Sequence, residues 1–345
     1  MSLKHFRTHD LVSLLFLRTP NSVQGTDPLR GLNMHAFKTV MIAITRSHTS
    51  ELELRQAFRL VADNNARLVM AFFDQSLEVM RKLQFIPLEG KLEAAMRRQL
   101  ELDAEKVKQL AWEEGIEAEV HIVAGKPRQL ISGLIDEFGV DLVIKLADPC
   151  GALARNQLTG NDLALLRKCP VPVLMMACRD QLPDFTGRIL VAVDVGDPDS
   201  DAVALNRSLL LHGHYLSSQE EAELHVVTVW NLPVNNPALR MLGDEEIYEL
   251  QESTHQRYQK RLEKALSEAG IDPDSKTVNV HLLKGNAARE IQKLANEINV
   301  DLVVMGTLSR HAQGMLMGNT AENILNNIYC SILAVKPDGF VSPLA

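Results

Sequence analysis

The stretch "DLVVMGT", from Asp301 to Thr307, has a near copy earlier in the chain, "DLVIKLA", which begins at Asp141. The two aspartates stand 160 residues apart, and the same spacing separates "HIVAG" at His121 from "HLLKG" at His281. Because the order of these segments is preserved, the 345-residue chain consists of two copies of one unit, not of many short repeats.

Each copy alternates short apolar runs with helical stretches. Runs rich in β-branched residues at Val40–Ile44 and Ile189–Val193 begin the copies, and long charged stretches that end at Gly115 and Gly270 predict long helices. Strands that alternate with helices of this length indicate a parallel sheet covered on both faces. We therefore expect an α/β fold of two tandem doubly wound domains, each with a five-stranded parallel sheet.

The same comparison predicts the domain limits. We expect a poorly packed N-terminal extension at residues 1–35, a first domain at 36–178 and a second domain at 187–338. Between the domains, "CRDQLPDFTG" at 178–187 contains a proline and a glycine and is the predicted linker.

Composition excludes several classes of function. The formal net charge is -8, and the basic residues are scattered among acidic ones, so we expect no nucleic-acid partner. No apolar run is long enough to span a membrane. The four cysteines show no metal-ligand spacing and fit a reducing compartment, which favours the cytoplasm.

A glycine-rich segment follows the last copy of the repeated strand: "GTLSRHAQGMLMGNTAEN", Gly306 to Asn323. In open α/β sheets, ligands bind beyond the carboxyl ends of the strands, where the strand order reverses. The candidates there are Gly306, Asp194 and the run Val226–Trp230. The glycines would let a phosphate approach the backbone at the start of a helix, although such glycines are often only turns.

The helix that follows this segment has a possible capping pair. Asn319 and Glu322, three residues apart, are similar to a capping box, which predicts Asn319 as the helix cap.

Taken together, "LVIKLA", "LLRKCPVPVLMM" and "GNTAEN…CSILAVKPD" make the chain resemble the universal stress protein family, over roughly residues 36–338. The family's nucleotide-binding loop is written G-x2-G-x9-G-[ST]. The resemblance implies a stress-response or regulatory protein that binds ATP or another adenine nucleotide with Mg²⁺ and is not an enzyme. It also implies that the last strands of the two domains pair as an intramolecular pseudo-dimer. The implied nucleotide-binding residues are Asp194, Val226, Gly306, Ser309, Gly318, Asn319 and Thr320.

The loop departs from the family pattern in three ways. Ser309 replaces the second glycine, Gly318 follows Gly306 by 12 positions where the family has 13, and Thr320 comes one place late. Two alternatives therefore stay open: a nucleotide-free module that binds a protein partner or an apolar ligand, and, more weakly, a slow ATPase. The protein partners are unknown, and a further homodimer is also left open.

The first domain lacks the nucleotide pattern. Thr45 stands where Asp194 stands in the second domain, and Lys145 and Leu146 end the strand that Gly306 ends there. We expect no ATP site in this domain. We expect Lys145 to extend its charge toward water near the domain interface.

The remaining histidines and cysteines suggest structural roles. His212 and His214 flank Gly213, which predicts an exposed helix end, because a metal site would need more ligands than these two. His121, His225 and His281 are expected to be structural. Cys169 and Cys330 occupy matching places in the two copies, which favours packing over redox chemistry.

Overall fold

The fold is described from a computed structural model. It covers residues 37–45, 51–82, 89–146, 158–177, 187–196, 199–219, 222–232, 239, 241–307, 318–327, 330–337 and 340. The predicted extension at 1–35, most of the predicted linker, and Ser309 lie outside the described residues.

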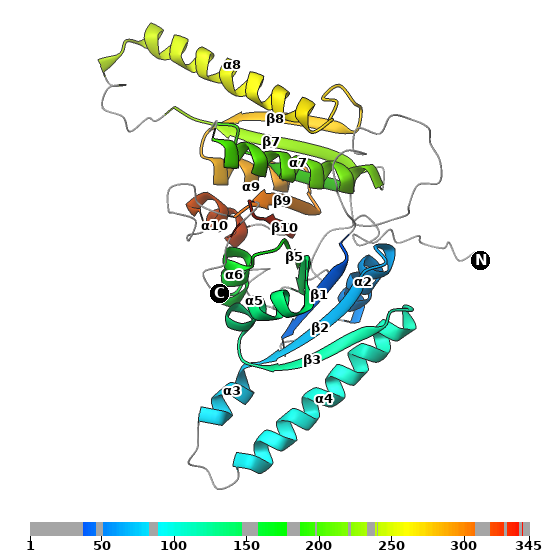
Figure 1. The fold of residues 1–345 in the computed structure, drawn as a ribbon. Coiled ribbons are helices and arrows are strands. Elements are labelled where there is room, and N and C mark those ends of the chain that lie inside the picture. Colours follow the sequence, from blue (N-terminus) through cyan, green and yellow to red (C-terminus); the bar gives the residue numbers. More distant parts are fainter. Residues whose placement is uncertain are drawn as a thin grey trace, which may run out of the picture.

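Both halves of the chain contain the alternation that the sequence predicts (Figure 1). The elements of the first half are β1 (Thr39–Thr45), α2 (Glu51–Asp63), β2 (Arg67–Asp74), α3 (Gln75–Lys82), α4 (Glu89–Glu113), β3 (Ala118–Ala124), α5 (Pro127–Phe138), β4 (Leu142–Leu146), α6 (Gly160–Lys168) and β5 (Val173–Met176). Those of the second half are β6 (Arg188–Ala192), α7 (Ser200–Gln219), β7 (Glu223–Trp230), α8 (Asp244–Glu268), β8 (Val278–Lys284), α9 (Ala287–Glu297), β9 (Leu302–Gly306), α10 (Asn319–Asn326) and β10 (Ser331–Val335).

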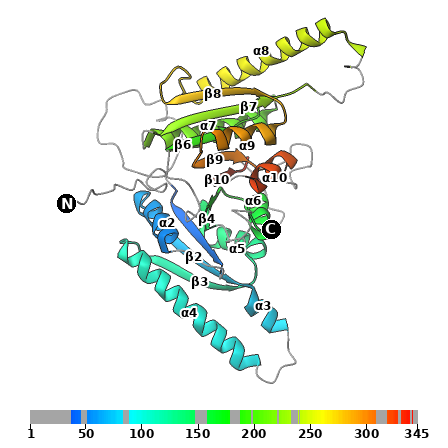
Figure 2. The same cartoon turned by 180° about the vertical axis from the view of Figure 1, so that it is seen from behind.

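The strands of both halves form one continuous sheet in the order β3-β2-β1-β4-β5-β10-β9-β6-β7-β8. All pairs within a half are parallel, whereas β5 and β10 pair antiparallel, with Leu174 opposite Leu333. The two five-stranded halves are thus joined by their last strands at the centre of the sheet. The long helices α4 and α8 lie at its two outer ends (Figures 1 and 2).

Apolar side chains cover both faces of the sheet, as expected for parallel strands that are buried on both sides. One core includes Phe58 of α2, Ala104 of α4, Leu209 of α7 and Leu262 of α8. The core on the other face includes residues of α5, α6, α9 and α10. Each core contains residues of both halves, so the halves share their hydrophobic layers.

Two glycines end the long helices as the sequence predicts. Gly115 and Gly270 follow α4 and α8 with φ values of 78° and 70°, a left-handed conformation that glycine adopts without a steric penalty. The fold prediction of two tandem α/β domains is confirmed.

The prediction of a helix end at Gly213 is wrong. Helix α7 continues through this position, so His212 and His214 lie inside it. The place where a Cβ of Gly213 would stand is already taken by Cγ2 of the buried Val191 in β6. The glycine therefore lets α7 pack closely on the sheet.

None of the helices in the described parts of the chain combines the length and hydrophobicity that a membrane crossing requires.

Candidate functional site

The candidate site lies where the strand order of the second half reverses. β6 and β9 are neighbours, with Ala192 opposite Met305, while the chain leaves β6 for α7 on one face and reaches α10 on the other. The segments that follow these two strands therefore meet at one edge of the sheet. This edge carries Asp194 after β6 and Gly306 at the end of β9, as the sequence predicts for a ligand site.

The turn that holds Asp194 is fixed by a buried amide. Asn206 of α7 accepts a hydrogen bond from Asp194 N (3.1 Å) and donates one to Asp194 O (2.7 Å). The Asp194 carboxylate accepts from Gly196 N through Oδ1 (2.9 Å), and its side chain lies at the surface. The sheet edge thus presents a carboxylate on a rigid turn.

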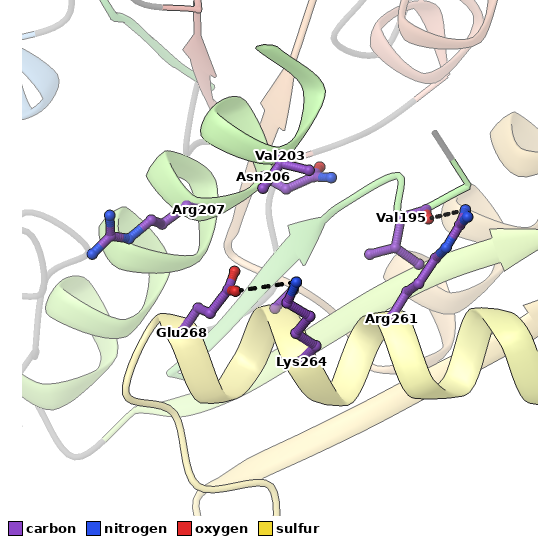
Figure 3. A pocket seen from close by; sticks show the side chains of 8 residues that line it. Val195, Val203, Asn206, Arg207, Arg261, Lys264 and Glu268 are labelled. Carbon is purple, nitrogen blue, oxygen red and sulfur yellow. Dashed lines mark hydrogen bonds and ion pairs between the residues drawn. The ribbon is translucent and has the colours of Figure 1, made fainter. Parts of the chain in front are cut away.

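Helix α8 holds the same turn through Arg261 (Figure 3). Arg261 donates to the carbonyl oxygens of Val195 (3.2 Å) and Gly196 (2.6 Å), and the Tyr258 hydroxyl lies where a Cβ of Gly196 would stand. A cavity of about 180 Å³ separates α7 from α8 here. It is lined by Val195, Val203, Asn206, Arg207, Arg261, Lys264, Ala265 and Glu268. Lys264 pairs with Glu268 at 3.6 Å, so the arginine and lysine on α8 are both engaged by the protein itself.

The glycine-rich segment contributes its two ends to the described structure. A Cβ on Gly306 would lie 2.9 Å from Leu205 Cδ2, so this glycine allows β9 to pack against α7. At the other end, Gly318 N donates to Thr307 O (3.3 Å), which brings the two ends of the segment together.

The predicted capping role of Asn319 is wrong. α10 begins at Asn319, and its N-cap is Gly318, which has no side chain that could accept from the first N–H groups. Asn319 and Thr320 are exposed in the first turn, beside those N–H groups. The structure therefore brings Gly318, Asn319 and Thr320 together at a helix N-terminus that its own cap residue does not cover.

Val226 lies farther from this edge than the other candidates. It is fully buried in β7, between Val191 and Val280 on the neighbouring strands. The residue at the end of the β6–β7 pairing is Thr228, which follows the last pair, Ala192 with Val227. Sequence reasoning included Thr228 only as part of a strand-end run.

Thr228 carries a buried hydroxyl that makes no hydrogen bond to any described residue. Leaving such a group unsatisfied costs about 1–3 kcal/mol. We expect the nearly isosteric Thr228→Val substitution to raise the free energy of unfolding by about 1 kcal/mol, as measured by urea denaturation. A loss of stability would contradict this, because it would show that the hydroxyl has a partner in solution.

The matching helix of the first domain is capped differently. Thr159 caps α6, and its hydroxyl accepts from Asp162 N (3.2 Å), while Asp162 Oδ2 accepts from Thr159 N (2.9 Å) and Oγ1 (2.8 Å). The other carboxylate oxygen, Oδ1, lies 2.7 Å from Lys145 Nζ. The prediction that Lys145 extends toward water is wrong, since 1% of its side chain is exposed. In the first domain, the Asp162 carboxylate thus occupies the N-terminus of the last helix, α6.

Two histidines form a contact that the sequence does not reveal. His225 Nδ1 and His281 Nε2 are 3.0 Å apart on neighbouring strands, with their rings stacked at 5.3 Å between centroids. Burial lowers the pKa of both imidazoles, which favours their neutral forms. His121 contacts Glu119 at 2.9 Å.

No group of three or more metal-ligating side chains occurs within the described residues.

Cys169 and Cys330 are free thiols buried in the core. Burial raises the pKa of Cys169 to about 12 and also raises the pKa of Cys330. A reactive thiol needs a lowered pKa and access to solvent. The raised pKa and the burial of both thiols therefore support the packing role that the matched placement of these cysteines predicts.

Comparison with known proteins agrees with the fold. The Universal stress protein family model matches residues 36–177 and 186–336. Universal stress protein E of Photorhabdus laumondii is 28% identical over 323 residues, which are 90% of this chain and 98% of that protein. Universal stress protein E of Salmonella typhi is 30% identical over 237 residues, covering 67% of this chain and 72% of that protein.

Solved structures show the same architecture. A putative universal stress protein from Pseudomonas aeruginosa UCBPP-PA14 superposes with a TM-score of 0.66 at 24% identity, covering 89% of this chain and 96% of that one. A universal stress protein from Archaeoglobus fulgidus gives a TM-score of 0.56 at 17% identity, covering 88% and 97%. With two family matches in tandem and relatives along most of its length, the chain belongs to the universal stress protein family.

Proposed function

We propose that the second domain binds an adenine nucleotide, with ATP and Mg²⁺ as the first candidate, and that the protein acts in a stress response by binding and not by catalysis. The observation that carries this proposal is the contrast between α10 and α6. Helix α10 has a glycine cap without a side chain, whereas α6 is closed by the Thr159–Asp162 capping box and by Lys145.

Helix N-termini attract phosphate because their first N–H groups have no partner within the helix and carry a partial positive charge. At α10 a phosphate would meet these groups beside the side chains of Asn319 and Thr320. Asp194, on its rigid turn at the same edge, has an oxygen-rich side chain suited to a ribose hydroxyl or an adenine amine. Mg²⁺ would accompany the phosphates, since it prefers oxygen ligands.

In the first domain the corresponding place already holds an anion. The Asp162 carboxylate lies in the first turn of α6 and its charge is paired with Lys145. A second anion would meet the repulsion of this carboxylate. We therefore infer one nucleotide per chain. Few cysteines, two of them buried free thiols, support a cytoplasmic setting for this role.

Calorimetric titration with ATP and Mg²⁺ tests the proposal. We expect the parent chain to bind one nucleotide, and we expect Gly318→Val to bind at least tenfold more weakly, because its branched side chain would crowd the phosphate. The backbone of Gly318, with φ -64° and ψ 138°, suits any residue, so the substitution introduces no backbone strain.

Gly160→Ala is the matched control at the start of α6, where an added Cβ meets no atom within 4 Å. This variant should bind like the parent. If the parent gives no heat with ATP, ADP or AMP, the nucleotide proposal is wrong, and the nucleotide-free interaction module becomes the better interpretation. If Gly318→Val binds as well as the parent, the phosphate does not lie at α10.

A further inference from the structure

The base of the glycine-rich segment rests on the first domain. Thr307 follows β9 directly and is fully buried, and its carbonyl accepts from Gly318 N. Its hydroxyl donates to the carbonyl oxygen of Leu166 in α6, at 3.0 Å. A residue that ties the two ends of the candidate loop together is therefore itself held by the other domain, at the point where α6 and α10 lie side by side (Figures 1 and 2).

A buried lysine completes this contact. Lys336 follows β10 directly, and its ammonium group donates to both the Leu166 carbonyl and the Thr307 hydroxyl. Burial lowers the pKa of Lys336 to about 8, so the charged form still predominates at pH 7. The positive charge lies at the C-terminal end of α6, where the partial negative charge of a helix favours it.

The sequence explains why the Leu166 carbonyl is available. In a helix this oxygen would accept from the residue four positions later, which is Pro170 and has no N–H group. α6 also ends at Lys168, so Leu166 lies in its last turn. Thr307 and Lys336 thus satisfy a carbonyl that α6 itself cannot satisfy.

Among the described residues, the first domain has no counterpart of the Lys336 contact. Met176 pairs with Leu146 in the first domain as Val335 pairs with Gly306 in the second, which makes Ala177 the equivalent of Lys336. Alanine cannot bridge to a neighbouring helix. The first domain therefore has no matching lysine with which to support its own loop region from the second domain.

We propose that the first domain serves as the anchor of Gly318 and the start of α10 in the second domain, through the Leu166 carbonyl, the Thr307 hydroxyl and the Lys336 ammonium group. This inference rests on the proposed function and assigns the first domain a part in it. Thr307 and Lys336 are positioning residues, since they act on Gly318 and the start of α10 and not on the nucleotide.

The test compares Thr307→Val, which removes the hydroxyl at nearly constant volume, with Thr307→Ser, which keeps it. Lys336→Met is the second disrupting variant. Ser331→Ala is the control, because Ser331 Oγ accepts from Ala177 N (3.3 Å) and links the domains away from the loop. Each full-length variant is titrated with ATP and Mg²⁺, and exchange of the Gly318 amide hydrogen is followed by NMR.

We expect Thr307→Val and Lys336→Met to bind ATP at least tenfold more weakly and to exchange the Gly318 amide faster, while Thr307→Ser and Ser331→Ala stay within twofold of the parent. Equal affinity of Thr307→Val and the parent would overturn the inference. If the parent itself binds no nucleotide, the proposed function fails, and the Gly318 exchange then decides the anchor alone. Unchanged exchange in Thr307→Val would overturn the anchor in that case too.

Discussion

Lys145→Met should destabilise the protein by about 3–5 kcal/mol, because it leaves the Asp162 carboxylate buried without its counter-charge. The two side chains are 1% and 0% exposed, so water cannot replace the lost ammonium group. The free energy of unfolding from urea denaturation, followed by circular dichroism, measures the loss. We expect the whole ten-stranded sheet to respond, since both hydrophobic cores extend through the two domains.

A double variant separates the charge from the packing. Lys145→Met combined with Asp162→Asn removes both charges, while the asparagine oxygen can still accept from Thr159. Replacing both partners of a buried pair is often nearly neutral, so the double variant should regain most of the lost stability. If the double variant is as unstable as the single one, the loss comes from the shape of the lysine side chain and not from its charge.

Gly213→Ala should cost about 1–3 kcal/mol, because the new methyl group would overlap the Val191 side chain. Val191 is fully buried and β-branched, so it has little freedom to move aside. α7 would have to shift away from the sheet. Thermal or urea unfolding of the variant measures the cost, which exceeds what alanine normally adds to a helix.

Gly133→Ala is the matched control. This glycine also lies inside a helix, α5, but an added Cβ meets no atom within 4 Å. Here the higher helix propensity of alanine should raise stability by about 0.5–1 kcal/mol. Opposite signs at the two glycines would support close packing of α7 on β6. A gain in stability at both would show that α7 is not pressed against Val191.

The order and type of the elements could be predicted because these features are local in the sequence. Apolar runs and long charged stretches identify strands and helices from neighbouring residues alone. Gly115 and Gly270 mark the helix ends in the same local way. The internal sequence repeat in addition predicts the division into two domains. Asp194 and Gly306 could be predicted at the ligand-binding edge of the sheet because they stand at the ends of two predicted strands, and in the structure they follow or end the neighbouring strands β6 and β9.

Two of the errors, at Lys145 and Gly213, concern partners distant in the sequence, and the third concerns the neighbouring residue. The sequence predicts Lys145 near water because its neighbours in the chain give no sign of Asp162. The sequence predicts a helix end at Gly213 because nothing nearby points to Val191 in β6. The sequence predicts Asn319 as a cap because Glu322 follows three residues later, but the cap is the preceding residue, Gly318. The contact of Thr307 with Leu166 joins two domains, and no local sequence pattern indicates it.

The antiparallel pairing of β5 with β10 has a consequence for how the protein responds to its own concentration. Both strands belong to one chain, so their association is intramolecular and has a high effective concentration set by the tether. Dilution therefore cannot separate the two halves, as it can separate subunits held by mass action. Two halves of one chain can also differ in sequence, whereas the subunits of a homodimer are identical. One half can therefore diverge in sequence from the other, as the side-chain cap of α6 and the glycine cap of α10 have done here.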